Sequence, residues 1–248
     1  LKQLSARRLV EELRMRQKAD QYQTVHTLLQ KFPTEGIAGE ILQEVKELLG
    51  EFPEPSDLAP VKVISEEKEK YIREKYIVQT EKNCFMPLYI LIPKNNRKKH
   101  PAILCCHGHG YYGKDPIAGA INNNPEITAS IQVHNYNYGE QMAERGFITI
   151  CPDWRSFGER IGYYNQFTPQ DICNIHFIQH LILGRTLLGA NVFDGMRAID
   201  FLLTRNDVDA DNIGCMGLSF GGTMTTYLTL LEPRIKAADI ICYATTTK

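Results

Sequence analysis

The stretch that most constrains the fold of this chain is Gly-Leu-Ser-Phe-Gly-Gly at residues 217–222. Its first five residues match the pattern G-x-S-x-G. The apolar residues 212–216 predict a short buried strand before it, and residues 220–231 predict a helix after it. Glycines are needed at such a junction because side chains would clash where strand and helix fold back on each other, and the serine between them keeps its Oγ exposed. We therefore expect a strand–turn–helix unit centred on Ser219.

A second motif follows another predicted strand. Residues 101–106 form an apolar run typical of a strand buried on both faces, and His-Gly-His-Gly follows at residues 107–110. If Ser219 attacks a carbonyl group, the oxygen that becomes negative needs backbone N–H donors. One comes from a loop of this kind and the other from the residue after the serine. The predicted donors are His109 and Phe220. A plain turn and half of a metal site are the other interpretations of residues 107–110.

Five glycines belong to the two motifs. Each is expected to let the backbone approach either its neighbours or a substrate closely, because glycine lacks a Cβ. They are Gly108, Gly110, Gly217, Gly221 and Gly222.

Three segments recur in an order that resembles a known family. These are residues 107–110, residues 152–158 (Pro-Asp-Trp-Arg-Ser-Phe-Gly) and residues 208–222. Together they resemble the acetyl xylan esterase and dienelactone-hydrolase-like branch of the α/β-hydrolases, which is close to the prolyl-oligopeptidase-type catalytic domains. The resemblance covers roughly residues 70–245 and implies an α/β-hydrolase fold with Ser219 as nucleophile. Ser156 departs from the pattern, because many relatives have glycine there.

The order of elements also indicates an α/β fold. From Ala102 onward predicted strands alternate with helices, which implies a mainly parallel, twisted sheet flanked by helices. The predicted neighbouring parallel strands are 102–106, 147–151, 212–216 and 237–242. Helices are expected around residues 138–145 and 187–203, and residues 71–80 and 85–93 predict an antiparallel pair that precedes them.

The chain divides into two parts. Residues 1–60 predict an N-terminal helical segment followed by a Pro-rich linker, and residues 61–248 predict the hydrolase domain. One helix of the first part carries an apolar stripe of Ile41, Val45, Leu48 and Leu49. We expect such stripes to pack on the hydrolase body or on a partner chain, and a homo-oligomer is one form of that contact.

The remaining members of a catalytic triad are not assigned within the chain. In this fold the order is nucleophile, acid, histidine, whereas all seven histidines, and also Asp194 and Asp200, precede Ser219. The acid and the histidine are therefore expected beyond Lys248. We expect a longer parent polypeptide and a C-terminally incomplete hydrolase domain here, since two further strand–helix units need on the order of 50 to 60 residues.

Polar segments at the carboxyl ends of strands are expected to shape the substrate site. Residues 111–137 and 159–183 are rich in Tyr, Asn and Gln, a composition that suits a sugar-like substrate such as an acetylated sugar. Asp153 and Arg155 follow a predicted strand end. We expect them, with His107, to support the site through a salt-bridge network that fixes the loop, and direct contact with substrate is the alternative.

Composition excludes several classes of protein. The net charge of −1 gives no basic surface for nucleic acid, and no apolar stretch is long enough to span a membrane. The seven cysteines lie mostly in apolar runs and lack C-x-x-C spacing, which indicates buried thiols in a reducing, cytoplasmic protein.

The sequence thus predicts a serine hydrolase acting on a small-molecule carboxylic ester without a cofactor. A peptidase of the prolyl-oligopeptidase type and a catalytically silent binding protein of the same fold are the alternatives. A metallohydrolase is a third, with ligands from His107, His109, His176 and His180. His176 and His180 share a helix face, but Phe177 stands where the motif H-E-x-x-H has glutamate, so no metal is expected.

Overall fold

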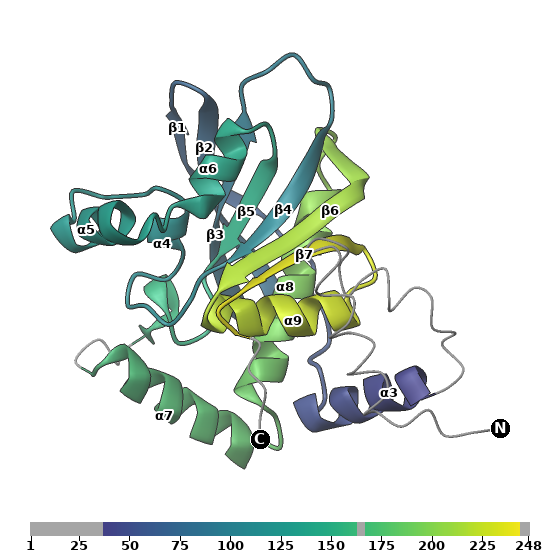
Figure 1. Cartoon of the computed structure of the whole chain (residues 1–248). Coiled ribbons are helices and arrows are strands. Elements are labelled where there is room, and N and C mark those ends of the chain that lie inside the picture. The colour runs from purple at the N-terminus through teal and green to yellow at the C-terminus, as the bar shows by residue number, and fades with distance from the viewer. Residues whose placement is uncertain (1–36, 163–166, 244–248) are drawn as a thin grey trace, which may run out of the picture.

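A single twisted sheet organises the molecule (Figure 1). The computed structural model describes residues 37–162 and 167–243, so the part of the predicted N-terminal helical segment before residue 37 lies outside the described residues. Seven strands form the sheet in the order β1-β2-β3-β5-β4-β6-β7. Their bounds are β1 Val61–Glu67, β2 Tyr71–Glu81, β3 Cys84–Pro93, β4 His100–Cys106, β5 Ile148–Pro152, β6 Val208–Leu218 and β7 Ile235–Ile241.

The parallel half of the sheet matches the sequence prediction. β4 pairs in parallel with β5 on one side and with β6 on the other, and β6 pairs in parallel with β7. Cys106 at the end of β4 lies opposite Gly217 near the end of β6. The two motifs that follow these strands therefore meet at the same edge of the sheet, because parallel strands end together.

The antiparallel half was predicted in part. β2 and β3 pair as expected, and β3 joins the parallel half by pairing with β5. β1 was not predicted. It is an edge strand, and all but one of its seven residues are exposed. Its apolar residues Val61, Val63 and Ile64 stay exposed, so pairing with β2 rather than burial holds this strand in the sheet.

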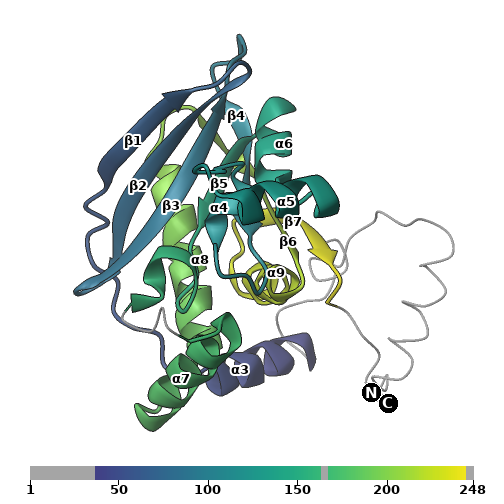
Figure 2. The ribbon, with the colours of Figure 1, turned by 90° about the vertical axis from the view of Figure 1, so that its left-hand side faces the viewer.

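Helices cover both faces of the sheet, as Figure 2 shows. The predicted helices α6 (Tyr138–Glu144), α8 (Leu187–Leu203) and α9 (Phe220–Leu231) are confirmed. Further helices interrupt the two long polar segments: α4 (Lys114–Ile117), α5 (Pro125–His134), α7 (Pro169–Ile182) and the short 3₁₀ turn η1 (Gly158–Arg160). α5 and α7 each begin with proline after a capping side chain, Asn124 and Thr168 respectively.

Helix α3 (Ile37–Leu49) packs on the core of the sheet through two residues of the predicted stripe and through Leu42. Leu42, Val45 and Leu49 contact the core, whereas Ile41 and Leu48 are 49% and 78% exposed. The packed residues follow the spacing i, i+3, i+7 of one helical face. The carbonyl of Leu49 also accepts a hydrogen bond from Thr186 Oγ1 at 2.6 Å, which ties the end of α3 to the start of α8.

Two apolar clusters hold the layers together. α8 and α9 pack on one face of the sheet, where Ile199, Leu202 and Leu228 are fully buried, and α6 packs on the other face through Ala143. Burial of side chains on both faces explains why β4 and β5 are nearly continuous apolar runs. The loops after β4, β5 and β6 are left together at one edge of the sheet.

Candidate active site

Ser219 stands alone between β6 and α9. β6 ends at Leu218 and α9 begins at Phe220, and the serine adopts φ 59° and ψ −115°. Its side chain is exposed, and its N–H donates to the carbonyl of Ile241 at 2.9 Å. A positive φ at a residue with a Cβ costs on the order of 1–3 kcal/mol and persists only where the surroundings enforce it. The turn therefore presents Ser219 Oγ at the edge of the sheet, as predicted.

The glycines beside Ser219 are required by close backbone contacts. A Cβ on Gly221 would lie 1.9 Å from the carbonyl oxygen of Cys106, and one on Gly217 would lie 2.4 Å from that of Gly221. A Cβ on Gly222 would lie 2.8 Å from the carbonyl oxygen of Ile241. α9 thus begins directly against β4 and β7, at distances that only glycine allows.

The loop after β4 lies against Ser219. A Cβ on Gly108 would be 2.9 Å from the hydroxyl oxygen of Tyr136 and 3.6 Å from Ser219 Cβ. A Cβ on Gly110 would meet no atom within 4 Å, so packing within the protein does not require glycine there. The ring of His109 packs on Phe157 and Phe220, with ring centroids 5.0 and 4.9 Å apart.

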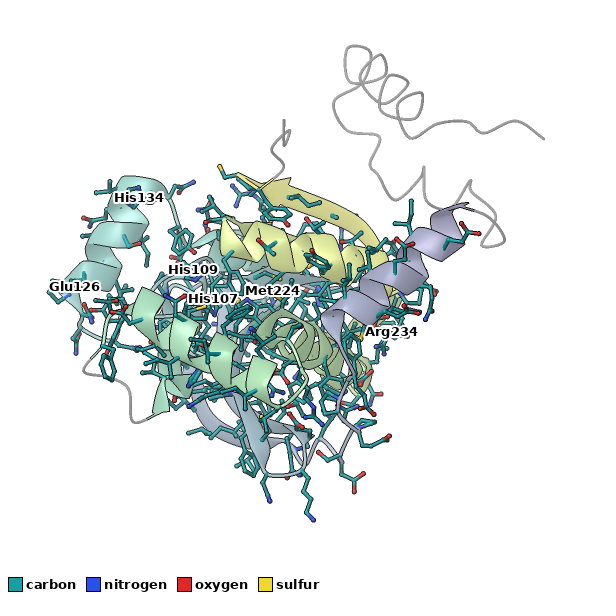
Figure 3. All side chains as sticks on the ribbon, turned by 90° about the horizontal axis from the view of Figure 1, so that it is seen from below. His107, His109, Glu126, His134, Met224 and Arg234 are labelled. Carbon is teal, nitrogen blue, oxygen red and sulfur yellow. The ribbon has the colours of Figure 1, made fainter. Side chains whose placement is uncertain are left out.

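The predicted oxyanion donors lie on the two segments that meet at this point. His109 is in the loop after β4, and Phe220 is the first residue of α9. In the described part of the chain, neither N–H donates to another backbone group. Figure 3 labels His107 and His109 at this end of the molecule. The role of the His109 and Phe220 N–H groups as oxyanion donors stays a prediction.

Both ring nitrogens of His107 are hydrogen-bonded to backbone groups. It is fully buried, its Nε2 accepts the N–H of Trp154 at 3.1 Å, and its Nδ1 lies 2.8 Å from the carbonyl oxygen of Gly108. Because Nε2 accepts, the proton is assigned to Nδ1, which donates to Gly108. Burial lowers the pKa of His107 to about 4. The neutral ring thus joins the loop after β4 to the loop after β5.

The depressed pKa of His107 predicts acid sensitivity. Between pH 6.5 and 4 the unfolded chain binds a proton on His107 that the folded chain does not, so the free energy of unfolding should fall as the pH falls. The expected contribution is about 3 kcal/mol over that range. Urea denaturation at stepped pH should show this slope and its loss in His107→Gln, while His134→Gln, at an exposed position, retains it. An equal slope in wild type and His107→Gln would contradict the assignment.

Asp153 is the centre of a buried network. Its carboxylate is fully buried and accepts the backbone N–H of Lys114 at 2.9 Å, Lys114 Nζ at 2.8 Å and the N–H of Glu159 at 3.0 Å. A Cβ on Gly113 or Gly158 would lie 2.2 Å from Asp153 Oδ1, and these glycines have φ of 50° and 54°. The network fixes the loops after β4 and β5 to each other, and the sequence analysis missed Lys114.

Arg155 forms its ion pair with Asp194 and not with Asp153. Its guanidinium donates to both carboxylate oxygens of Asp194 at 2.8 and 2.9 Å, and Arg160 donates to the same carboxylate at 2.7 Å. Burial alone would raise the pKa of Asp194, but the two guanidinium groups lower it to about 2. Asp194 is therefore a structural anion of α8 that holds the loop after β5.

The one departure noted from the family pattern, Ser156, has a structural explanation. It adopts φ 83°, a conformation that favours glycine, and its fully buried Oγ lies 2.7 Å from Nδ1 of His176 on α7. This serine–histidine contact joins α7 to the loop after β5. Unlike Ser219, Ser156 is not accessible to solvent and does not lie at a junction between a strand and a helix.

A cavity of about 430 Å³ lies beside these loops. Among its lining residues are Cys84, Phe85, Arg155, Arg160, His176 and His180. The segment 159–183 contributes to this cavity, but neither Ser219 nor His109 lines it, so its predicted part in a substrate site stays a prediction. Both arginines of the cavity pair with Asp194, and Arg155 also pairs with Glu81 at 2.8 Å.

The described residues, 37–162 and 167–243, were also predicted to lack a metal site and a membrane span and to carry free thiols. They contain no group of three or more His, Cys, Asp or Glu side chains placed to hold a metal ion. None of their helices combines the length and the apolar composition needed to cross a membrane. All seven cysteines are free thiols, and Cys105, Cys106, Cys151 and Cys215 are buried.

The strand–turn–helix at Ser219 and the sheet around it are the fold expected for the family that this sequence matches. The sequence profile of the Abhydrolase family matches residues 2–246. The chain belongs to the Abhydrolase family. The α/β-hydrolase fold expected from the resemblance is thereby confirmed. The matched region includes all the residues that the structure describes.

Individual relatives are longer than this chain. A Bacillus subtilis (strain 168) protein named as a hydrolase, YtaP, is 26% identical over 198 residues, which are 79% of this chain and 60% of that protein. A Bacteroides fragilis structure named as an acetyl xylan esterase superposes with TM-score 0.67 at 24% identity, over 86% of this chain and 58% of the other. A glucuronoyl esterase from Solibacter usitatus gives TM-score 0.57 at 18% identity, over 83% and 57%. The chain thus spans about 60% of the length of these relatives.

Proposed function

We propose that Ser219 is the nucleophile of a serine hydrolase that cleaves small-molecule carboxylic esters. The observation that carries this proposal is the exposed serine at φ 59° between β6 and α9, with the loop after β4 beside it. Ser219 Oγ attacks the ester carbonyl, the alcohol leaves, and water hydrolyses the acyl-enzyme. The N–H groups of His109 and Phe220 stabilise the tetrahedral oxyanion, a contribution typically worth about 10²–10³ in rate for each donor.

The proposal assigns the triad acid and base to sequence beyond Lys248. A serine hydroxyl needs a general base within hydrogen-bond reach. In the described residues no histidine ring is hydrogen-bonded to Ser219 Oγ; His107 is bonded to backbone groups, and His176 to Ser156. The greater length of the relatives supports this assignment.

The substrate class we favour is an acetylated or otherwise esterified sugar. Support comes from the names of two similar structures, an acetyl xylan esterase and a glucuronoyl esterase, and from polar residues such as Tyr111 and Tyr112 in the loop after β4. Hydroxyl and amide groups match the hydrogen bonding of a sugar.

A fluorophosphonate probe tests the proposed nucleophile. In the natural polypeptide that contains this chain, we expect one covalent adduct, located by mass spectrometry on the peptide that includes Ser219. Residues 1–248 alone should label poorly and should not hydrolyse aryl acetates, because the base is absent. An adduct on Ser156, or hydrolysis that a chelator abolishes, would contradict the proposal.

A further inference from the structure

The hydroxyl of Tyr136 lies beside the proposed nucleophile and has no part in the mechanism above. Tyr136 belongs to the short connection between α5 and α6, which returns the chain to the loop after β4. Its hydroxyl oxygen accepts the N–H of Gly108 at 2.7 Å. A residue from a distant part of the sequence thus contacts the backbone of the loop that lies against Ser219.

The position of this hydroxyl follows from the space around Gly108. A Cβ built on Gly108 would lie 2.9 Å from the Tyr136 hydroxyl oxygen, 3.0 Å from the carbonyl oxygen of Leu218 and 3.6 Å from Ser219 Cβ. The phenol oxygen and the nucleophile's side chain therefore border the same small volume. The absence of a side chain at Gly108 is what allows both groups to approach it.

The phenol proton is available for a substrate. The hydroxyl oxygen uses a lone pair to accept from Gly108, so its own proton can be donated elsewhere. In the described residues this proton can be accepted by the hydroxyl oxygen of Tyr138, whose own proton is donated to the carbonyl of Cys106 at 2.5 Å, and a substrate oxygen would have to replace that contact. Burial raises the pKa of Tyr136, although the Gly108 N–H and the Tyr138 hydroxyl act in the opposite direction. The phenol is thus protonated near neutral pH.

The hydroxyl is also held in place. The ring of Tyr136 packs edge-on against that of Tyr138, with centroids 5.6 Å apart, and Tyr138 is itself buried. A donor that is oriented before the reaction needs no reorganisation as charge develops, and this is the condition under which hydrogen bonds stabilise an oxyanion most.

We propose that Tyr136 is a catalytic residue. Its hydroxyl donates a third hydrogen bond to the oxyanion that forms when Ser219 attacks the ester carbonyl. This inference rests on the proposed function of Ser219. The other two donors are the backbone N–H groups of His109 and Phe220, which no substitution except proline removes. Tyr136 is thereby the one side chain among the three donors, and mutation can delete it.

Tyr136→Phe tests this role in the natural polypeptide that contains the chain. We expect kcat for an aryl acetate to fall by about 10²-fold with KM changed by less than about threefold, as for loss of one oxyanion donor. Inhibition by a trifluoromethyl ketone, which forms a tetrahedral oxyanion on serine, should weaken by the same factor as kcat/KM. Tyr76→Phe is the matched control, because its hydroxyl bonds to Glu74 on β2, and it should behave as wild type.

A fluorinated tyrosine at position 136 separates catalysis from packing, should Tyr136→Phe fold poorly. Fluorination lowers the phenol pKa while keeping the ring and its contacts. Activity should then fall with rising pH through the new phenol pKa, because a phenolate cannot donate. Wild-type kcat and pH profile in the Tyr136 variants, with Ser219→Ala inactive, would overturn the Tyr136 proposal alone. Full activity in Ser219→Ala would overturn the proposed nucleophile as well.

Discussion

Ser219→Ala is expected to abolish ester hydrolysis. Removal of the nucleophile in a serine hydrolase lowers kcat on the order of 10⁶-fold, and the remaining turnover reflects binding and the oxyanion donors alone. The fold should be retained, because the Ser219 side chain is exposed and the N–H bonded to Ile241 remains. Steady-state hydrolysis of an aryl acetate by the natural polypeptide measures the effect, and a thermal unfolding curve checks the fold.

Ser156→Ala is the matched control for this experiment. Ser156 is the other serine at a positive φ among the described residues, and its Oγ contacts His176. Because Ser156 is fully buried, its loss should change kcat by less than about tenfold while lowering the free energy of unfolding by about 1 kcal/mol for the lost hydrogen bond. The reverse pattern, with Ser156→Ala inactive and Ser219→Ala active, would identify Ser156 and His176 as the reacting pair.

Lys114→Met is expected to give the largest loss of stability. The ammonium group is fully buried and lies 2.8 Å from the fully buried carboxylate of Asp153. Burial alone would lower the pKa of Lys114, but Asp153, Asp115 and Glu159 raise it, so the lysine is charged in the folded protein. Removing one partner of a buried ion pair leaves the other charge unpaired and costs about 3–5 kcal/mol. Urea denaturation measures this change.

Two further variants define the origin of the Lys114→Met effect. Lys75→Met also removes an ammonium group bonded to Glu159, at 2.6 Å, but that carboxylate is 43% exposed, so the expected loss is at most about 1 kcal/mol. In Lys114→Met combined with Asp153→Asn the unpaired charge is gone, and part of the stability should return. Equal losses for Lys75→Met and Lys114→Met would show that burial of the pair does not determine its contribution.

The central features of the fold could be predicted because their sequences carry a local signal. The strands β4, β5 and β6 are apolar runs, and the helix α8 has apolar residues at helical spacing. Glycines specify the turn at Ser219. The structure shows why at Gly217 and Gly221, where a Cβ would clash with backbone carbonyl oxygens. These features depend on neighbours in the sequence, which is why pattern reasoning reaches them.

The groups that were missed depend on partners far along the chain. Tyr136 meets Gly108 across 28 residues, and Lys114 meets Asp153 across 39. A single tyrosine or lysine in a polar segment has no periodic signal, and its partner is chosen by the sheet topology. Of α7 the sequence predicted only the helix face that His176 and His180 share, and the apolar residues Phe177, Ile178, Leu181 and Ile182 of this helix are exposed rather than packed on the sheet.

The carboxylate of Asp153 occupies the space that a Cβ at Gly113 or at Gly158 would need. The sequences of the loops after β4 and β5 are therefore expected to change together in evolution. Gly113 in one loop and Gly158 in the other each leave room for the same oxygen atom. A substitution at either glycine would displace the anion that orders the opposite loop. Relatives that change substrate should therefore exchange both loops together, or vary only the segments outside 113–158, such as α7 and its flanks. Transplanting one loop into another member of the family should fail unless the other loop accompanies it.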